Sequence, residues 1–384
     1  MSTEFNQFNT PAHASSPSLG SGQVAEIAAA REPVQKAALN LRMVRGPLQP
    51  QQNQSIISQY NSLASEDIST EDFLRWIQNS PEGPAWHAIL ETIDGDIVGH
   101  TSLIPIPATY NGRPAVAAKS EFSFIREEYR TAKIRGFEQS GRLKNLIYID
   151  ELFKLCRAEG WSPLLISTSS SYHRVFRSIA CYPVNFPLWE CLLVLRPGKA
   201  ASGTPNLQSW QRASLWGTGL IQTTLWSPTL LFSDRSELRR FPAHEKPLPP
   251  CGQKLLCFQD KESLIWRYPE EQYTRIAESG QGADLIVKHG SDTRYLRVCQ
   301  WQSGVPTAAL ITELVQMARQ QRALGVRWAV YEGDTGSAAV VSRLRSLGFL
   351  CARRVRTLLI NTAERELLEC SKWNLTDAMF SFDH

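Results

Sequence analysis

The hydrophobic pattern is clearest between Pro114 and Gly160, where it predicts a strand, a basic turn and a helix. Side chains alternate along the first part, with one set at Val116, Ala118, Ser120, Phe122 and Phe124 and the other at Lys119, Glu121 and Ser123. This two-residue period predicts a strand with an apolar even-numbered side and a polar odd-numbered side. Apolar residues then recur at three- and four-residue steps up to Cys156, which predicts an amphipathic helix ending at Gly160.

Residues 124–142 join this strand to this helix and are rich in Arg, Lys and Gly. A basic, glycine-containing turn that opens a helix offers backbone N–H groups and the positive end of the helix dipole. Such a turn suits a phosphate group. An ordinary solvated connection accounts for the same residues equally well, so the sequence leaves both interpretations open.

The same analysis predicts a repeated order of elements along the chain. In the first half, strands are expected at 39–44, 85–92, 97–106, 163–168 and 188–195, and helices at 51–63, 70–78 and 171–179. In the last third, strands at 283–287, 295–300, 326–332 and 351–360 alternate with helices at 307–324 and 337–347. Strand, long helix, strand, short helix and strand thus occur twice, which favours an internal duplication.

Composition divides the chain into four parts, with boundaries at residues 38, 198 and 255. Residues 1–38 are rich in Ser, Pro, Gly, Ala, Asn and Gln, which predicts a disordered tail. Residues 39–198 and 256–384 are predicted to be two domains. Residues 199–255 hold several prolines and are predicted to be a linker. Its partly apolar stretch is expected to be an interdomain helix rather than a membrane-surface helix, because Arg212 is the one cation on its polar face.

Length and charge exclude some classes of function. The 384 residues are 42% apolar, enough for real cores, and the formal net charge of +4 does not predict a nucleic-acid partner. We expect no signal peptide and no membrane span, because no long apolar run is present. The 8 cysteines lack a C-x-x-C pair, and no metal-ligand spacing is seen. Reduced thiols in a cytoplasmic protein, with no bound metal, are therefore expected.

The element order resembles the acyl-CoA N-acyltransferase superfamily, the GNAT fold, and specifically the bacterial tandem-domain type associated with polysaccharide biosynthesis. The likeness rests on the stretches 80–86, 94–100, 124–130, 264–269, 344–349 and 373–380. It implies an α/β protein of two tandem GNAT-like domains, each a central mixed sheet flanked by helices. It also implies acetyl-CoA or another acyl-CoA as co-substrate and a small-molecule amine, such as an amino sugar, as acceptor.

In that family a glycine-rich loop wraps the coenzyme A pyrophosphate with backbone amides. The similar residues here run from Arg130 to Gly136, with Lys133 and Arg135 where Gly or Ala is usual. The resemblance implies cofactor binding by Phe124, Ile125, Arg126, Arg130, Lys133, Arg135 and Gly136. The basic side chains of this turn could instead be plain surface charges, and both readings have equal weight.

Amine acylation needs a base, and Glu121 on the polar side of the central strand is the best candidate. An ion pair of Glu121 with Lys119 or an arginine is the alternative. The family's tyrosine, which protonates the leaving thiolate, falls on Phe176 in the first half. Tyr172, one helical turn earlier, and His173 are then the candidate acids or substrate contacts.

The second half departs further from the family pattern. The position of the tyrosine falls on Leu344, and residues 301–306 make a poor phosphate cradle. This half is expected to be structural or to form a wall of the acceptor site. Because neither half keeps the tyrosine, a non-catalytic protein for binding or assembly in a polysaccharide pathway is the alternative function.

Overall fold

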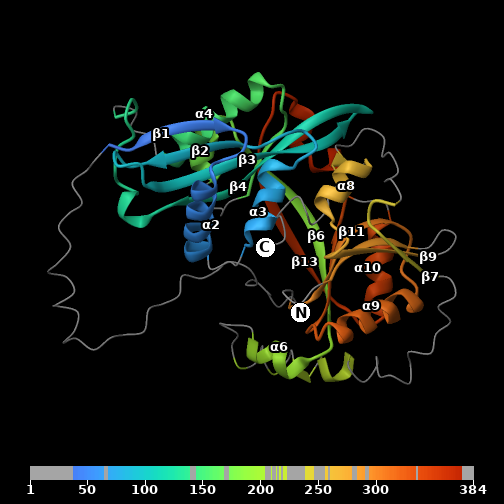
Figure 1. Cartoon of the computed structure of the whole chain (residues 1–384). Coiled ribbons are helices and arrows are strands. Elements are labelled where there is room, and N and C mark those ends of the chain that lie inside the picture. The colour runs from blue at the N-terminus through green and yellow to red at the C-terminus, as the bar shows by residue number, and fades with distance from the viewer. Residues whose placement is uncertain are drawn as a thin grey trace, which may run out of the picture.

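The computed structural model describes most of the chain from residue 38 to residue 373 (Figure 1). The described residues are 38–64, 68–138, 144–167, 173–203, 209, 213, 216–217, 219–222, 238–245, 256–257, 260–278, 283–289, 294–333 and 336–373. Residues 1–37 of the predicted tail and most of the predicted linker at 199–255 lie outside them. No helix among the described residues is long and apolar enough to cross a membrane.

The strands and helices of the first half follow the predicted order. The elements are β1 (Asn40–Arg45), α2 (Pro50–Ala64), α3 (Thr70–Gln78), β2 (Trp86–Glu91), β3 (Ile97–Tyr110), β4 (Arg113–Ile125), η1 (Glu127–Tyr129), α4 (Lys144–Ala158), β5 (Leu164–Ile166), α5 (His173–Phe176), η3 (Arg177–Ile179), β6 (Tyr182–Val194) and α6 (Pro197–Gly203). Local chemistry explains several boundaries. Ser69 begins α3 by accepting a hydrogen bond from the Asp72 backbone N–H, and Gly95 takes a φ of 89° in the turn before β3.

The second half repeats this order in shorter form. Its elements are β7 (Leu238–Phe241), β8 (Leu256–Cys257), α8 (Lys261–Arg267), β9 (Tyr273–Glu278), β10 (Asp284–Lys288), β11 (Leu296–Ser303), α9 (Ala308–Gln320), β12 (Gly325–Tyr331), α10 (Ser337–Ser346), β13 (Leu350–Asn361), η5 (Arg365–Leu368) and η6 (Cys370–Lys372). Both halves contain one parallel strand pair joined by a helix, β4–α4–β5 and β11–α9–β12. The same crossover therefore occurs in both halves, as the repeated order of elements predicted.

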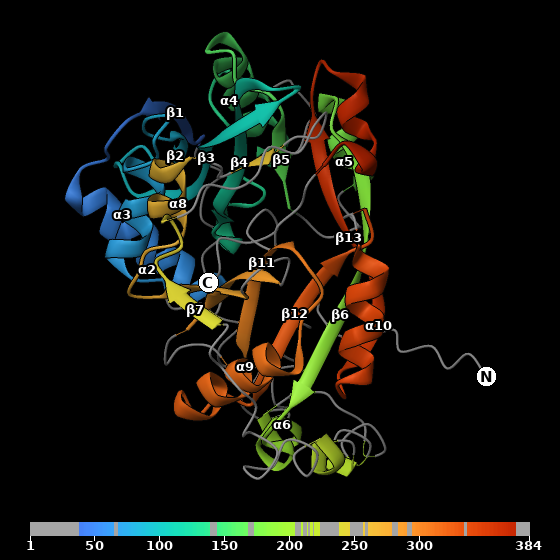
Figure 2. The same cartoon turned by 90° about the vertical axis from the view of Figure 1, so that its right-hand side faces the viewer.

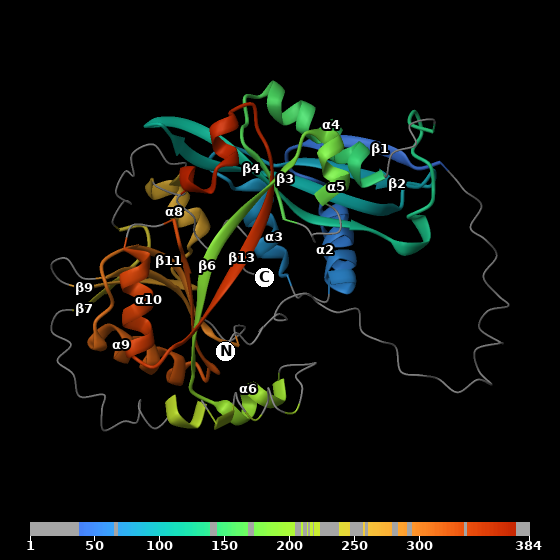
Figure 3. The same cartoon turned by 180° about the vertical axis from the view of Figure 1, so that it is seen from behind.

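All the described strands belong to a single mixed sheet. Its order is β1-β2-β3-β4-β5-β13-β6-β12-β11-β10-β9-β7, with β8 paired to β3 off this path. The two halves exchange their final strands at its centre: β13 lies beside β5 of the first half, and β6 lies beside β12 of the second. The long strands β6 and β13 run side by side between the two halves (Figure 3). The mixed α/β class expected from sequence is confirmed, and the sheet is continuous through both halves.

Three hydrophobic cores pack against this sheet. The α2/α3 core includes Phe73, Trp76 and Phe122 and continues into α8 and Trp373 of the second half. The α4 core lies on the opposite face of the first half, and the α9/α10 core covers the second half. Figure 2 shows α2, α3 and α8 together on one side of the first half. Helix α8 of the second half therefore helps to cover this side of the first half.

One expectation about β4 is wrong, because the strand changes face at a bulge. Val116 and Ala118 contact the α4 core, whereas Phe122 and Phe124 belong to the α2/α3 core. Between these pairs, Phe122 and Ser123 stand opposite the single residue Thr101 of β3. This extra residue shifts the two-residue period, so the even-numbered side chains do not share one apolar side.

Candidate functional site

The candidate site lies where β4 leaves its parallel neighbour β5. The ladder between these strands has two residue pairs, Ala118 with Leu164 and Lys119 with Leu165. Strand β5 ends at Ile166, while β4 continues to Ile125. Past Lys119, the side of β4 that faced β5 has no ladder partner among the described residues. The bulge and Glu121 occupy this free part of the strand.

The backbone is strained at the bulge. Phe122 has a φ of 53°, in the left-handed region that bulky side chains rarely adopt. Two side chains of β3 bind carbonyls at the bulge: Ser102 Oγ donates to the Glu121 carbonyl at 3.1 Å, and His100 Nδ1 donates to the Phe122 carbonyl at 2.9 Å. Strained backbone held by such side-chain hydrogen bonds clusters at functional sites.

A second histidine supports His100 from the neighbouring strand. His87 Nδ1 and His100 Nε2 are 3.1 Å apart, and the two rings are stacked with centroids at 5.4 Å. Because His100 Nδ1 donates to a carbonyl, its Nε2 accepts the proton of His87 Nδ1, and both rings are neutral. Burial lowers the pKa of His100 to about 4 and, together with the neighbouring His100, holds the pKa of His87 well below 6.5.

Sequence analysis missed this histidine pair, because the pairing depends on a register shift in the β2–β3 hairpin. His87 stands opposite Ser102, and His100 stands opposite Ile89, so the two rings are diagonal neighbours on one face of the β2–β3 hairpin. A register shift between Leu90 and Glu91 creates this arrangement. Counting outward from the Asp94-Gly95 turn as a regular hairpin would have placed the two histidines on opposite faces.

Glu121, the predicted base, forms an ion pair with the Lys119 Nζ two residues earlier on β4. The Lys119 side chain is 0% exposed and the Glu121 side chain is 12% exposed. Both lie on the face of Ala117, which belongs to the α2/α3 core. Glu121 is therefore ion-paired, as the alternative interpretation expected. Its side chain also remains partly exposed to solvent.

A cluster of three hydroxyl groups lies on the other face of the bulge. Thr101 Oγ1 is hydrogen-bonded to Ser120 Oγ at 3.2 Å and to Ser123 Oγ, and the two serine hydroxyls are 3.3 Å apart. Ser123 is exposed, whereas Thr101 and Ser120 are buried. The bulge thus presents a carboxylate to one face of the sheet and hydroxyl groups to the other.

The predicted phosphate turn packs back onto the start of β1. Leu39 N–H donates to the Lys133 carbonyl at 2.7 Å, and Arg135 N–H donates to the Leu39 carbonyl at 2.8 Å. Ile134 is buried between them in the α4 core. This contact leaves Lys133, Arg135 and Gly136 exposed, and Gly136 has a φ of 82°. The turn is therefore an ordered loop with cationic side chains on its surface.

This turn already holds one anion, the carboxylate of its own Glu138. The backbone N–H groups of Glu138 and Gly136 donate to that carboxylate and lower the pKa of Glu138, with smaller contributions from Lys133 and Arg135. Adjacent backbone N–H groups in a tight turn form an anion-binding nest. The turn thus offers backbone N–H groups and positive charge to an anionic group.

The remaining predicted site residues lie around the bulge and the turn. Phe124 stands opposite His100, and the N–H of Arg126, just after Ile125, donates to the Val98 carbonyl at 2.9 Å. The Arg126 guanidinium pairs with Glu128. Arg130 is exposed at the end of η1.

The two predicted acids have different outcomes. Tyr172 lies outside the described residues. His173 begins α5 and is half-buried, and its Nε2 has no hydrogen-bond partner in the described part of the chain. The structure therefore brings Glu121 and the bulge together at the end of β4, with the turn following directly along the chain.

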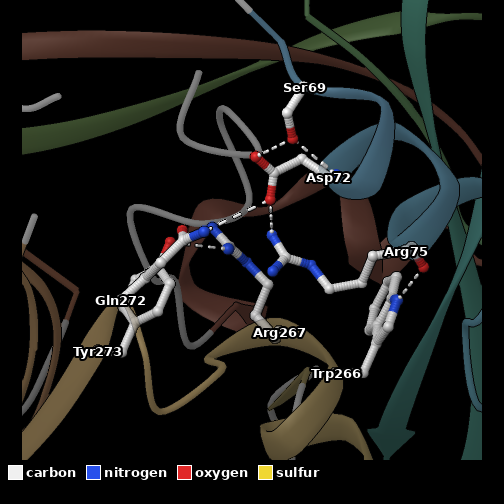
Figure 4. A network of polar contacts seen from close by, with 7 residues as sticks. All are labelled: Ser69, Asp72, Arg75, Trp266, Arg267, Gln272 and Tyr273. Carbon is white, nitrogen blue, oxygen red and sulfur yellow. Dashed lines mark hydrogen bonds and ion pairs between the residues drawn. The ribbon is translucent and has the colours of Figure 1, made fainter.

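A polar network joins α3 of the first half to α8 and β9 of the second, on the side of the sheet that carries Glu121 (Figure 4). Asp72 pairs with Arg75 at 2.6 Å and accepts a hydrogen bond from Gln272 Nε2 at 3.5 Å. Trp266 Nε1 donates to the Arg75 carbonyl at 2.8 Å. Burial lowers the pKa of the Arg75 guanidinium from its usual value. These contacts hold α8 against α3 on the side of the sheet that carries Glu121.

The corresponding crossover in the second half, β11–α9–β12, lacks the basic turn that follows β4. The turn after β11 is closed by Trp301 Nε1, which donates to the Gly304 carbonyl at 3.0 Å. Thr307 then caps α9 by accepting a hydrogen bond from the Leu310 N–H. No residue of the turn at 304–307 is basic. Among the described residues, no group of three His, Cys, Asp or Glu side chains is placed to hold a metal ion.

Comparison with known proteins identifies the fold. No family model and no curated protein matches the sequence. Among solved structures, N-myristoyltransferase of Saccharomyces cerevisiae with bound myristoyl-CoA aligns with a TM-score of 0.50 at 12% identity, over 84% of this chain and 79% of that chain. A GCN5-related N-acetyltransferase from Kribbella flavida aligns with a TM-score of 0.43 at 11% identity, over 84% and 71%. The likeness to the yeast protein shows a common fold, in agreement with the architecture that the GNAT resemblance implied.

Proposed function

We propose that the protein is an acyl-CoA-dependent N-acyltransferase whose first half carries the reaction. The observation that carries this proposal is the strained bulge of β4, which stands beside Glu121 where β4 has left β5. The shared fold with an N-acyltransferase adds support. The co-substrate is acetyl-CoA or a longer acyl-CoA. The acceptor is a small amine, and amino sugars of a polysaccharide pathway are the first class to test.

The cofactor would be held by the turn that follows β4. Its pyrophosphate would replace the Glu138 carboxylate on the Gly136 and Glu138 N–H groups, with Lys133 and Arg135 adding positive charge. Arg126 and Arg130 lie just ahead of this nest. Coenzyme A supplies an activated acyl group as a thioester, and the residues of the turn supply its binding.

The chain's own residues then have defined tasks in the transfer. The Glu121 carboxylate takes a proton from the amine as the new C–N bond forms. When the C–S bond breaks, the thiolate receives a proton from one of the two candidate acids, His173 at the start of α5 or Tyr172. Lys119 positions Glu121 through their ion pair, and His100 positions the bulge through its bond to the Phe122 carbonyl.

Two measurements test this function. Acetyl-CoA and a longer acyl-CoA are titrated by calorimetry, and heat of binding is expected with wild type and with Glu121→Gln. A panel of amines, including amino sugars, is then screened by mass spectrometry for acyl transfer, which should fall about 100-fold or more in Glu121→Gln. Absence of any binding heat at high ligand concentration would contradict the proposal.

A non-catalytic binding or assembly role is the second candidate, because Lys119 already neutralises Glu121 and the turn already holds Glu138. This candidate predicts acyl-CoA binding without turnover of any amine, or no binding at all. Turnover that disappears in Glu121→Gln would exclude it.

A further inference from the structure

Two cysteines face each other on the exchanged strands. Cys191 of β6 and Cys351 of β13 are direct partners in the antiparallel ladder, and both contact the α9/α10 core. Opposed residues in such a ladder have Cα atoms about 4.5 or 5.5 Å apart. Both spacings lie within the range of about 4.4 to 6.8 Å that a disulfide bond spans. The backbone therefore already has the geometry for a bond between these two sulfurs.

The surroundings favour a thiolate at one member of the pair. The Cys191 thiol is hydrogen-bonded to the Cys351 sulfur, and this bond together with Arg345 lowers the pKa of Cys351. The same bond and burial raise the pKa of Cys191. The Arg345 guanidinium is itself held over the Trp189 ring, 4.4 Å from its centroid. Cys351 is half-buried and reachable from solvent, whereas Cys191 is fully buried. This is the arrangement of an attacking thiol with a resolving thiol behind it.

We propose that Cys191 and Cys351 form a redox-active dithiol that low-molecular-weight disulfides such as glutathione disulfide oxidise to a cross-strand disulfide bond. The Cys351 thiolate attacks one glutathione sulfur, forms a mixed disulfide and releases one glutathione thiolate. The Cys191 thiol then loses its proton and attacks the Cys351 sulfur, which releases the second glutathione. Two protein thiols are oxidised, and one glutathione disulfide is reduced to two thiols.

The bond would join the strands that hold the two halves together. It closes the long loop between residues 191 and 351, which restricts the unfolded chain and stabilises the folded one. It also makes the pairing of β6 with β13 permanent as long as the disulfide persists. The oxidised protein is therefore expected to unfold at a higher temperature than the reduced protein.

The test incubates the folded full-length chain with glutathione disulfide, blocks the remaining thiols and maps the peptides by mass spectrometry. A linked pair containing Cys191 and Cys351 is expected, with a thermal midpoint raised by roughly 5 °C or more and restored by dithiothreitol. Cys351→Ser should lose both the link and the shift. Cys191→Ala should stop at a glutathione adduct on Cys351.

Cys181→Ser is the matched control. Cys181 is also buried, and burial raises its pKa to about 12. It lies between η3 and β6, and no cysteine stands opposite it in the described ladders. This variant should keep the link and the shift. A stable glutathione adduct on Cys351 of the wild type, a link to another cysteine, or a 191–351 link that forms only after unfolding would each overturn the proposal.

Discussion

The two crossovers β4–α4–β5 and β11–α9–β12 have the same topology and different contents. Each is a parallel pair connected by a helix, and each has a register shift against the preceding strand. In the first, the irregular strand carries Lys119 and Glu121 and leads into a long basic turn. In the second, it carries Cys299 and Gln300 and leads into a short neutral turn. The comparison teaches that the crossover alone is scaffold, and that the turn and strand side chains add the chemistry.

Each half also contains a buried ion pair among its described residues, and the two pairs differ in position. Arg275 and Asp284 form two hydrogen bonds of 2.7 Å between β9 and β10, enclosed within the second half. Lys119 and Glu121 lie within one strand, at the end of the β4–β5 ladder. We therefore expect the first pair to affect stability alone and the second to affect stability and transfer.

Arg275→Met should give the largest effect on stability. It leaves the Asp284 carboxylate buried without its cation, which typically costs about 3 to 5 kcal/mol. Urea denaturation measures the change in the free energy of unfolding. Turnover per folded molecule should stay at the wild-type value, and a selective loss of turnover would break the proposed division between the halves.

Lys119→Met should destabilise the first half by about 3 kcal/mol, because Glu121 loses its buried partner. The double variant Lys119→Met/Glu121→Gln removes the stranded charge and should regain part of that loss in the same urea experiment. Unlike Arg275→Met, the single variant should also change the pH dependence of transfer, because the base has lost its neighbouring cation. An unchanged pH–rate profile would argue against Glu121 as the base.

The histidine pair should make stability depend on pH. Both pKa values are lowered by folding, so the unfolded chain takes up protons first as the pH falls below about 6.5. Stability is full above that pH and declines toward pH 4, by on the order of 3 kcal/mol for His100 if its pKa is about 4. Urea midpoints between pH 4 and 7.5 should show a weaker decline in His100→Asn. An equal decline in both proteins would contradict the assignment.

Glu138→Gln should give the smallest effect, a gain of a few-fold in affinity for coenzyme A. The neutral amide competes less well for the Gly136 and Glu138 N–H groups and removes a negative charge beside the phosphates. Calorimetry at low salt measures the change. Glu128→Gln is the matched control, because Glu128 pairs with Arg126 outside the nest. A similar gain in both variants would mean that general charge, rather than the nest, is responsible.

Local patterns predicted most elements of this fold. The hydrophobic pattern predicted the helix at 70–78, which is α3 (Thr70–Gln78), and the strands at 85–92 and 97–106, which correspond to β2 and β3. These features depend on neighbours in sequence, which is why a single chain reveals them. Strands β7 and β9 and helix α8 were not predicted.

The features that depend on distant residues could not be predicted in this way. The bulge at Phe122 relies on His100 and Ser102 of another strand, so the alternation along β4 looked unbroken. The exchange of β6 and β13 depends on pairing between the two halves, which no local period reveals. Glu121 lies on β4 as predicted, and its ion pair with Lys119 was the alternative weighed against a role as base. The role as base stays a prediction.

The exchange of final strands sets an order for synthesis. The first half acquires β13 as the neighbour of β5 only when Leu350–Asn361 has been made, so its sheet remains incomplete while the ribosome translates the whole second half. Domains that finish early can fold one after another during translation. Here the edge of β5 stays unpaired until β13 has been synthesised. In a nascent chain arrested before residue 350, that exposed edge could pair with a strand of another molecule.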